Sequence, residues 1–199
     1  VTYYNTAAFE KAGAEVPTTF DEFIEVCDKL LAAGVTPIGI KNDAWAGFIW
    51  FQQLIASYEP QLYLDICDGT KAYTDPDVVK VMEKWREMLD KGYFATPVQY
   101  DDVFKAFAKG ETAMVLEPNT LVTSLQSEYA MVSGEDFDVF ALPSMSGGKA
   151  TVFFEASPIC ISEASSTKEE ALEVMRVVFN PEVQKIMCEV PGIANTSTV

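Results

Sequence analysis

The segment FAKGETAMVLEPNT, residues 107–120, decides the fold class of this chain. A short apolar helical pattern stops at Gly110, and a compact apolar run then extends from Thr112 to Leu116. A short apolar run bounded by turn residues predicts a buried β-strand. The corner that follows, Glu117-Pro118-Asn119-Thr120, consists of a carboxylate, a proline and two small polar residues. A helix followed by a buried strand and a polar corner is typical of α/β proteins.

The same alternation of helix and strand runs along the rest of the chain. Thr19 and Glu22 form a capping box before an apolar stripe that ends at Gly34, and Asp75-Pro76 opens another helix that ends at Gly92. Further helices are expected at residues 44–57, 101–109, 119–126, 168–179 and 181–189. Strands are expected at 1–4, 35–40, 112–116, 137–142, 150–154 and 158–161, with 58–73 irregular. This alternation predicts an α/β fold with a mixed or parallel sheet flanked by helices.

Composition excludes several classes of partner and site. The 199 residues carry 14 Lys and Arg against 30 Asp and Glu, a net charge of -16, so no nucleic acid partner is expected. There is no histidine, which removes the commonest general base and metal ligand, and neither a metal nor a cofactor is expected. The four cysteines form no CxxC pair, and buried, inert thiols are expected rather than a disulfide.

Two predicted strands end in polar corners that contain candidate binding residues. Asn42, Asp43 and Trp45 follow the first strand, and Glu117, Asn119 and Thr120 follow the second. If the two strands are parallel, both corners lie on one rim of the sheet, where α/β proteins bind ligands. Carboxylates, amides and an indole suit a neutral polyhydroxylated ligand, because polar groups bond to hydroxyls and an aromatic face covers the C–H side of a sugar ring.

Other interpretations of these residues remain open. Asn42, Asp43, Asn119 and Thr120 are also ordinary helix N-caps, and Trp45 is equally suited to a core position. Tyr3 and Tyr4 point to opposite faces of a strand, so that one of them is able to face a cleft.

Acidic pairs also allow an enzymatic interpretation. Glu117 and Asp43 could act as the acid and base of a glycan-active enzyme, although no nucleophile motif, Walker sequence or GxGxxG accompanies them. No catalytic residue is therefore expected. A third interpretation is an interaction domain of the same fold without a ligand.

The order of several motifs resembles one known family. These motifs are Tyr3-Tyr4-Asn5, FEKAG at residues 9–13, VPTTFDEF at 16–23, FAKGETAM at 107–114, and FDVFALP at 137–143. Together with the helix pair between Ser162 and Met187, they resemble the family 1 extracellular solute-binding proteins of ABC transporters, in the sugar-binding branch. The resemblance covers nearly the whole chain.

This resemblance implies a periplasmic-binding-protein type II-like lobe in an incomplete two-lobe architecture. Residues 1–142 would form a crossing strand plus the C-lobe α/β domain. Residues 143–199 would form the return crossing with the strand and helices that accompany the N-lobe. The chain is accordingly expected to be the central fragment of a longer protein, with self-association of the surface that the other lobe would cover.

The resemblance also implies a non-catalytic function outside the cell membrane. The protein would bind a mono- or oligosaccharide and deliver it to an ABC permease, either as a membrane-anchored lipoprotein or in the periplasm. Ligand contacts in the family match the corners at 42–45 and 117–120 and the segment at 154–156, which contains Glu155. Many relatives have an aromatic residue where Thr120 stands, so the stacking role is expected of Trp45.

Overall fold

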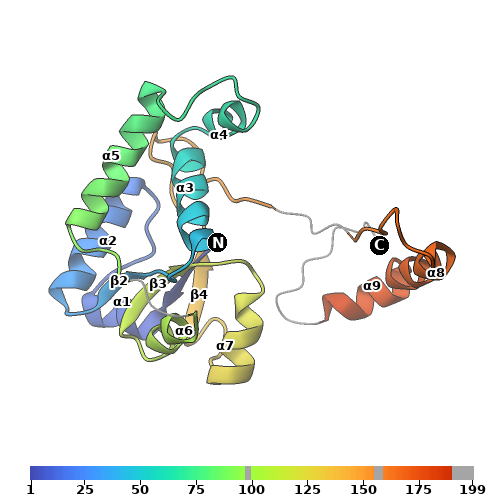
Figure 1. Cartoon of the computed structure of the whole chain (residues 1–199). Helices are drawn as coiled ribbons and strands as arrows, with labels where there is room; N and C mark the ends of the chain where they lie inside the picture. Colours follow the sequence, from blue (N-terminus) through green and yellow to red (C-terminus); the bar gives the residue numbers. More distant parts are fainter. Residues whose placement is uncertain (97–99, 155–158, 190–199) are drawn as a thin grey trace.

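The computed structural model describes residues 1–96, 100–154 and 159–189, and within these it has a four-stranded sheet with helices on both faces (Figure 1). The strands are β1 (Thr2–Asn5), β2 (Thr36–Gly39), β3 (Thr112–Leu116) and β4 (Phe137–Phe140). The helices are α1 (Thr6–Ala12), α2 (Phe20–Ala32), α3 (Ala44–Tyr58), α4 (Pro60–Cys67), α5 (Pro76–Asp90), α6 (Tyr100–Ala108), α7 (Leu121–Tyr129), α8 (Lys168–Val178) and α9 (Pro181–Cys188).

The sheet is mixed, with the strand order β2-β3-β1-β4. β2 and β3 are parallel, whereas β1 pairs antiparallel with both β3 and β4. The predicted mixed sheet is therefore confirmed. The strand of the opening segment, β3, lies inside the sheet with all five residues buried, as its apolar sequence predicts.

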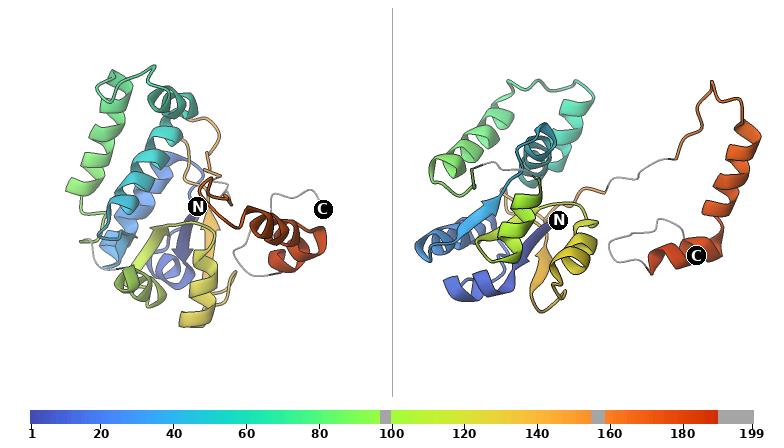
Figure 2. Two further views of the ribbon diagram at one scale, coloured as in Figure 1. Left: turned by 45° about the vertical axis from the view of Figure 1, so that its right-hand side comes forward. Right: turned by 60° about the horizontal axis from the view of Figure 1, so that its bottom comes forward.

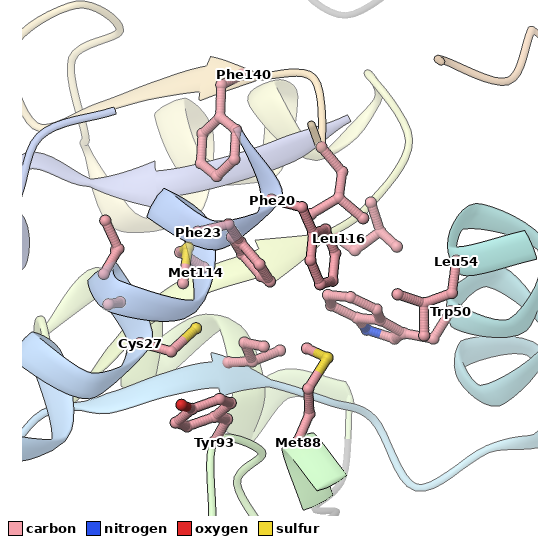
Figure 3. Packing of buried hydrophobic residues seen from close by; sticks show 14 of the residues in the cluster. Phe20, Phe23, Cys27, Trp50, Leu54, Met88, Tyr93, Met114, Leu116 and Phe140 are labelled. Carbon is pink, nitrogen blue, oxygen red and sulfur yellow. The ribbon is translucent and has the colours of Figure 1, made fainter. Parts of the chain in front are cut away.

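A separate apolar core packs against each face of the sheet. The larger core joins α1, α2, α3 and α5 to one face, and Figure 3 shows Phe20, Phe23 and Trp50 converging there with Met114 and Leu116 of β3. The smaller core holds α6 and α7 against the other face. Its members are Tyr3, Val103, Phe104, Phe107, Val115, Leu121, Leu125, Met131 and Phe137. Neighbouring residues of β3 thus contribute to opposite cores, as the alternation of a strand requires.

The helix signals read from the sequence are borne out by hydrogen bonds. Thr19 Oγ1 accepts a hydrogen bond from the backbone N–H of Glu22 at 3.2 Å, and the Glu22 carboxylate accepts one from the Thr19 N–H at 3.1 Å. The Asp75 side chain likewise caps α5, whose first residue is Pro76. These local contacts satisfy backbone donors that have no partner within a helix.

Two helices were not expected from the sequence. α1 begins directly after β1 because the Asn5 side chain caps it, accepting from the Ala8 N–H at 2.9 Å. The same side chain donates to the Phe107 carbonyl at 2.9 Å and so ties this helix start to α6. α4 lies within the segment predicted to be irregular, where Glu59 caps a helix that begins with Pro60. In both cases a cap and a compatible first turn decided the structure.

Other expectations were wrong. Residues 150–154 and 159–161 form no strand, because β-prone residues need a neighbouring strand and these segments pair with none in the described chain. Residue 158 lies outside the described residues. Only Cys27 is a buried thiol, since Cys67, Cys160 and Cys188 are exposed.

α8 and α9 pack against each other and stand away from the layered body (Figures 1 and 2). Neither helix contains a buried residue. Within the part of the chain that the structure describes, no helix is long and apolar enough to cross a membrane.

Candidate functional site

The two polar corners meet at one rim of the sheet. Because β2 and β3 are parallel, with Gly39 opposite Val115, their carboxyl ends emerge side by side. Lys41 lies two residues after the end of β2, Glu117 follows β3 directly, and their side chains touch. We predicted that both corners lie on one rim if the two strands are parallel, and the observed pairing of β2 and β3 confirms this.

A buried ion pair forms the floor of this rim. Lys41 Nζ lies 2.9 Å from Glu117 Oε1 and 3.0 Å from Oε2, and the two side chains are 5% and 7% exposed. Burial raises the pKa of the Glu117 carboxyl, and the nearby Asp43 carboxylate adds to this, whereas the Lys41 ammonium opposes the rise. A carboxylate and an ammonium removed from water together stay charged only when paired in this way.

Trp45 stands above this pair at the start of α3. Lys41 Nζ lies 4.3 Å from the centre of the indole ring, within the range of a cation–π contact. The Trp45 side chain is nevertheless 39% exposed. The interpretation of Trp45 as a core residue is therefore wrong, and the indole is available to a ligand. Trp50, one turn and a half further along the same helix, is buried in the core instead.

Asp43 has a structural role at the same place. Its Oδ1 accepts a hydrogen bond from the Ala46 N–H at 2.6 Å and so caps α3. The helix N-terminus carries a partial positive charge, which favours a carboxylate at this position. The N-cap interpretation is thus confirmed for Asp43, and Asp43 also lines the pocket.

These groups line a pocket of about 470 Å³. Its size lies within the range of roughly 300–1,000 Å³ that is usual for small-molecule sites. The lining residues are Lys41, Asp43, Trp45, Glu117, Pro118, Thr120, Leu121 and Ser124. Carboxylates, hydroxyls and an indole therefore border one opening, which is a set of groups suited to bonding hydroxyls while covering an apolar ring face.

The remaining candidates lie in different places. Thr120 lines the pocket and stands at the N-cap position of α7, although its side chain makes no cap hydrogen bond. Asn42 and Asn119 are exposed and flank the pocket in sequence without lining it. Tyr4 packs its ring against Phe9 and Phe140 and is not among the lining residues. Glu155 lies outside the described residues.

Four lining residues were not singled out from the sequence: Lys41, Pro118, Leu121 and Ser124. Lys41 is the most informative of them, because its charge is buried. A lysine that directly follows an apolar strand is a signal for such a role, but its partner is 76 residues away along the chain. Tyr3 stabilises the same corner, since its hydroxyl donates a hydrogen bond to the Pro118 carbonyl at 3.1 Å.

No group of three or more His, Cys, Asp or Glu side chains in the described ranges is arranged to hold a metal ion. The two carboxylates of the pocket are bonded to other groups of the protein. Both oxygens of Glu117 face the Lys41 ammonium, and Asp43 caps a helix. This arrangement presents fixed charges and a fixed ring to whatever enters the pocket.

Comparison with known proteins gives one family. A family model described as "Bacterial extracellular solute-binding protein" matches residues 1–199. A "Probable sugar-binding periplasmic protein" of Brucella suis biovar 1 (strain 1330) is 26% identical over 205 residues, which cover 98% of this chain and 47% of that protein. Its counterpart in Rhizobium meliloti (strain 1021) is 26% identical over 200 residues, 96% of this chain and 46% of the relative. The chain thus spans about half the length of these curated relatives.

Solved structures show the same fold. A "Chitin oligosaccharide binding protein" superimposes with a TM-score of 0.75 at 19% identity, covering 98% of this chain and 52% of that one. The structure described as "SBP RafE in complex with raffinose" gives a TM-score of 0.72 at 24% identity, covering all of this chain and 55% of its own. At these identities the likeness establishes the fold alone.

Proposed function

This chain belongs to the bacterial extracellular solute-binding protein family, and we propose that it binds a carbohydrate in the pocket between the ends of β2 and β3. The single observation that carries the proposal is the half-exposed indole of Trp45, which is supported by a buried ion pair and bordered by carboxylates. An aromatic face beside fixed hydrogen-bonding groups is the arrangement that suits a sugar ring.

The ligand is a mono- or oligosaccharide, and the protein acts as the solute-capturing component of an ABC importer. The relatives described as sugar-binding periplasmic proteins support this role. The protein works outside the cell membrane, in the periplasm or as an anchored lipoprotein, and delivers the sugar to a permease. Residues 1–142 form the crossing strand and the C-lobe, and residues 143–199 accompany the N-lobe.

Within the pocket we assign a role to each contributing group. Trp45 stacks on the sugar ring, while Asp43, Glu117 and Thr120 bond to hydroxyls. Asn42 and Asn119 bond to parts of the ligand that extend beyond the lining. The contacts predicted for Tyr4 and Glu155 stay predictions.

A catalytic role for Glu117 and Asp43 has no comparable support. An acid and a base must exchange protons with a substrate, whereas Glu117 is held by Lys41 on both oxygens and Asp43 is bonded to a helix N-terminus. The same restraints favour a binding site, because fixed groups lose little conformational entropy when a ligand binds.

The test is isothermal titration calorimetry on the full-length protein with a panel of neutral sugars. Trp45→Ala is expected to weaken the best ligand about tenfold or more, which corresponds to the loss of one aromatic contact. Tyr73→Ala is the matched control, since it removes a largely exposed ring outside the pocket lining. An unchanged affinity in Trp45→Ala would contradict the stacking role, and no binding of any sugar would contradict the function.

A further inference from the structure

A second exposed aromatic ring follows Trp45 on α3. Phe48 lies three residues further along the helix and is 50% exposed. Residues three apart lie on the same side of a helix, about 5–6 Å apart at their Cβ atoms. Trp45 and Phe48 therefore form one continuous aromatic strip, and only its Trp45 end lines the pocket.

The sequence of α3 makes this exposure unusual. AWAGFIWFQQLIASY is apolar around nearly its whole circumference, and a soluble helix of that kind is ordinarily buried on all sides. Much of α3 is indeed buried, including Trp50, Leu54 and Ile55 in its second half. The first turns of α3 nevertheless expose Trp45 and Phe48 to solvent, although two large aromatic rings gain free energy when they are covered.

Polar and aromatic groups continue the strip beyond Phe48. Gln52, one turn further, is half-buried and donates from Nε2 to the Tyr63 hydroxyl at 2.8 Å. Tyr63 in turn meets the Phe153 ring edge-on at 4.9 Å between ring centres. Gln52 of α3 thus lies beside two further rings, Tyr63 of α4 and Phe153 after β4.

We propose that Phe48 forms a second sugar subsite next to Trp45, so that the protein is selective for oligosaccharides over monosaccharides. The inference rests on the proposed function, and it names the ligand class for the same site. Trp45 covers the ring that enters the pocket, and Phe48 covers the next ring of the chain. Stacking on both requires two linked rings, which a monosaccharide does not have.

The free energy of binding favours a site with two stacking rings over a site with Trp45 alone. Each aromatic contact with a sugar face is worth about tenfold in affinity when it removes apolar area from water. The second contact adds to the first without a second loss of translational freedom, because the two rings are covalently linked. The gain in affinity therefore depends on the number of linked rings in the sugar.

The experiment compares wild type, Trp45→Ala and Phe48→Ala by calorimetry on the full-length protein. The probes are glucose, galactose, xylose and N-acetylglucosamine, together with maltose, cellobiose, raffinose, xylobiose and chitobiose. Wild type is expected to bind at least one of the longer sugars about tenfold or more tightly than its component monosaccharide. Phe48→Ala is expected to abolish most of that difference, whereas Trp45→Ala weakens both sugars.

Leu89→Ala is the matched control, since it removes an apolar side chain of similar exposure from α5. It is expected to leave every affinity unchanged. The inference is overturned if a monosaccharide binds as tightly as the sugars that contain it, or if Phe48→Ala weakens both lengths equally. The latter result would show that Phe48 contributes to packing within the protein and not to a second sugar subsite. If no probe binds to wild type, the proposed function fails as well, and this outcome differs from both of the others.

Discussion

Replacing Lys41 by methionine is expected to destabilise the fold strongly, although the residue lies at the edge of a proposed binding site. The substitution keeps the apolar stem of the side chain and removes its charge. Glu117, which is 7% exposed, then loses the ammonium that lies 2.9 and 3.0 Å from its two oxygens. Removing one partner of a buried ion pair costs about 3–5 kcal/mol, because the remaining charge is left without compensation.

The double variant Lys41→Met/Glu117→Gln separates this cost from other effects. With both charges removed, no buried ion remains, so the double variant is expected to recover most of the lost stability. The Glu117→Gln single variant removes the carboxylate charge from beside the buried Lys41 ammonium and is expected to be destabilised as well. Urea denaturation of the four proteins measures the coupling between the two residues, which is expected to exceed about 2 kcal/mol.

The pH dependence of the stability provides a second test of the same reasoning. Burial already raises the pKa of Glu117, and loss of Lys41 raises it further. A carboxyl whose pKa is raised by folding stabilises the folded state below its ordinary pKa, and this stability is lost as the pH rises through the raised value. The difference in stability between wild type and Lys41→Met is therefore expected to be small near about pH 4 and large near about pH 7.

Two results would refute this reasoning. One is a double variant as unstable as the sum of the single variants, which would show that the two charges do not compensate each other. The other is a Lys41→Met loss of equal size at both pH values, which would assign the effect to packing or to the contact with the Trp45 ring.

Three further predictions follow from local contacts. Asp43→Ala is expected to cost about 1 kcal/mol through loss of the α3 cap, whereas Asp43→Asn retains the cap, and thermal denaturation distinguishes the two. Gly39→Ala is expected to cost about 1–3 kcal/mol in urea denaturation, because its methyl group would lie 2.9 Å from Thr112 Cγ2. Gly47→Ala meets nothing within 4 Å and is expected to gain up to about 1 kcal/mol, so equal effects at the two glycines would contradict the packing argument. A thiol reagent is expected to modify one cysteine, Cys27, only after denaturation, since burial raises the pKa of this thiol and shields it, and rapid reaction of all four in the native protein would contradict this. The thiols expected to react at once are Cys67, Cys160 and Cys188.

The sequence predicted several parts of the fold that depend on local contacts, although α1 and α4, whose caps are also local, were missed. The capping box at Thr19 and Glu22 involves atoms within four residues, so its pattern is readable without knowledge of the rest of the chain. The shared rim was also predictable, because parallel strands bring their carboxyl ends together wherever they lie in a sheet. The places of Asp43 and Glu117 after the two predicted strands are enough to assign both residues to this rim.

Features that depend on distant parts of the chain were not predictable. The segment 150–154 has the composition of a strand, but a strand requires a partner, and the described sheet offers it none. Alternation places Tyr3 and Tyr4 on opposite faces, yet it does not say which face borders the site. Tyr3 has its hydroxyl beside Pro118, whereas Tyr4 packs against Phe9. The role of the Lys41 charge likewise depends on Glu117, which is distant in sequence and pairs with it in the fold.

The ion pair explains how an exposed tryptophan keeps a fixed place at the rim. A side chain on the first turn of a helix ordinarily samples several rotamers, and ordering it on binding costs about 0.5–1.5 kcal/mol. Lys41 is itself immobilised by two bonds to Glu117, and its ammonium lies 4.3 Å from the Trp45 ring centre. The ring is therefore attracted to a stationary charge on the protein side while its exposed part faces the pocket. Since β2 and β3 position these two charged residues, the sheet that stabilises the fold also fixes the surface on which we propose that the sugar stacks.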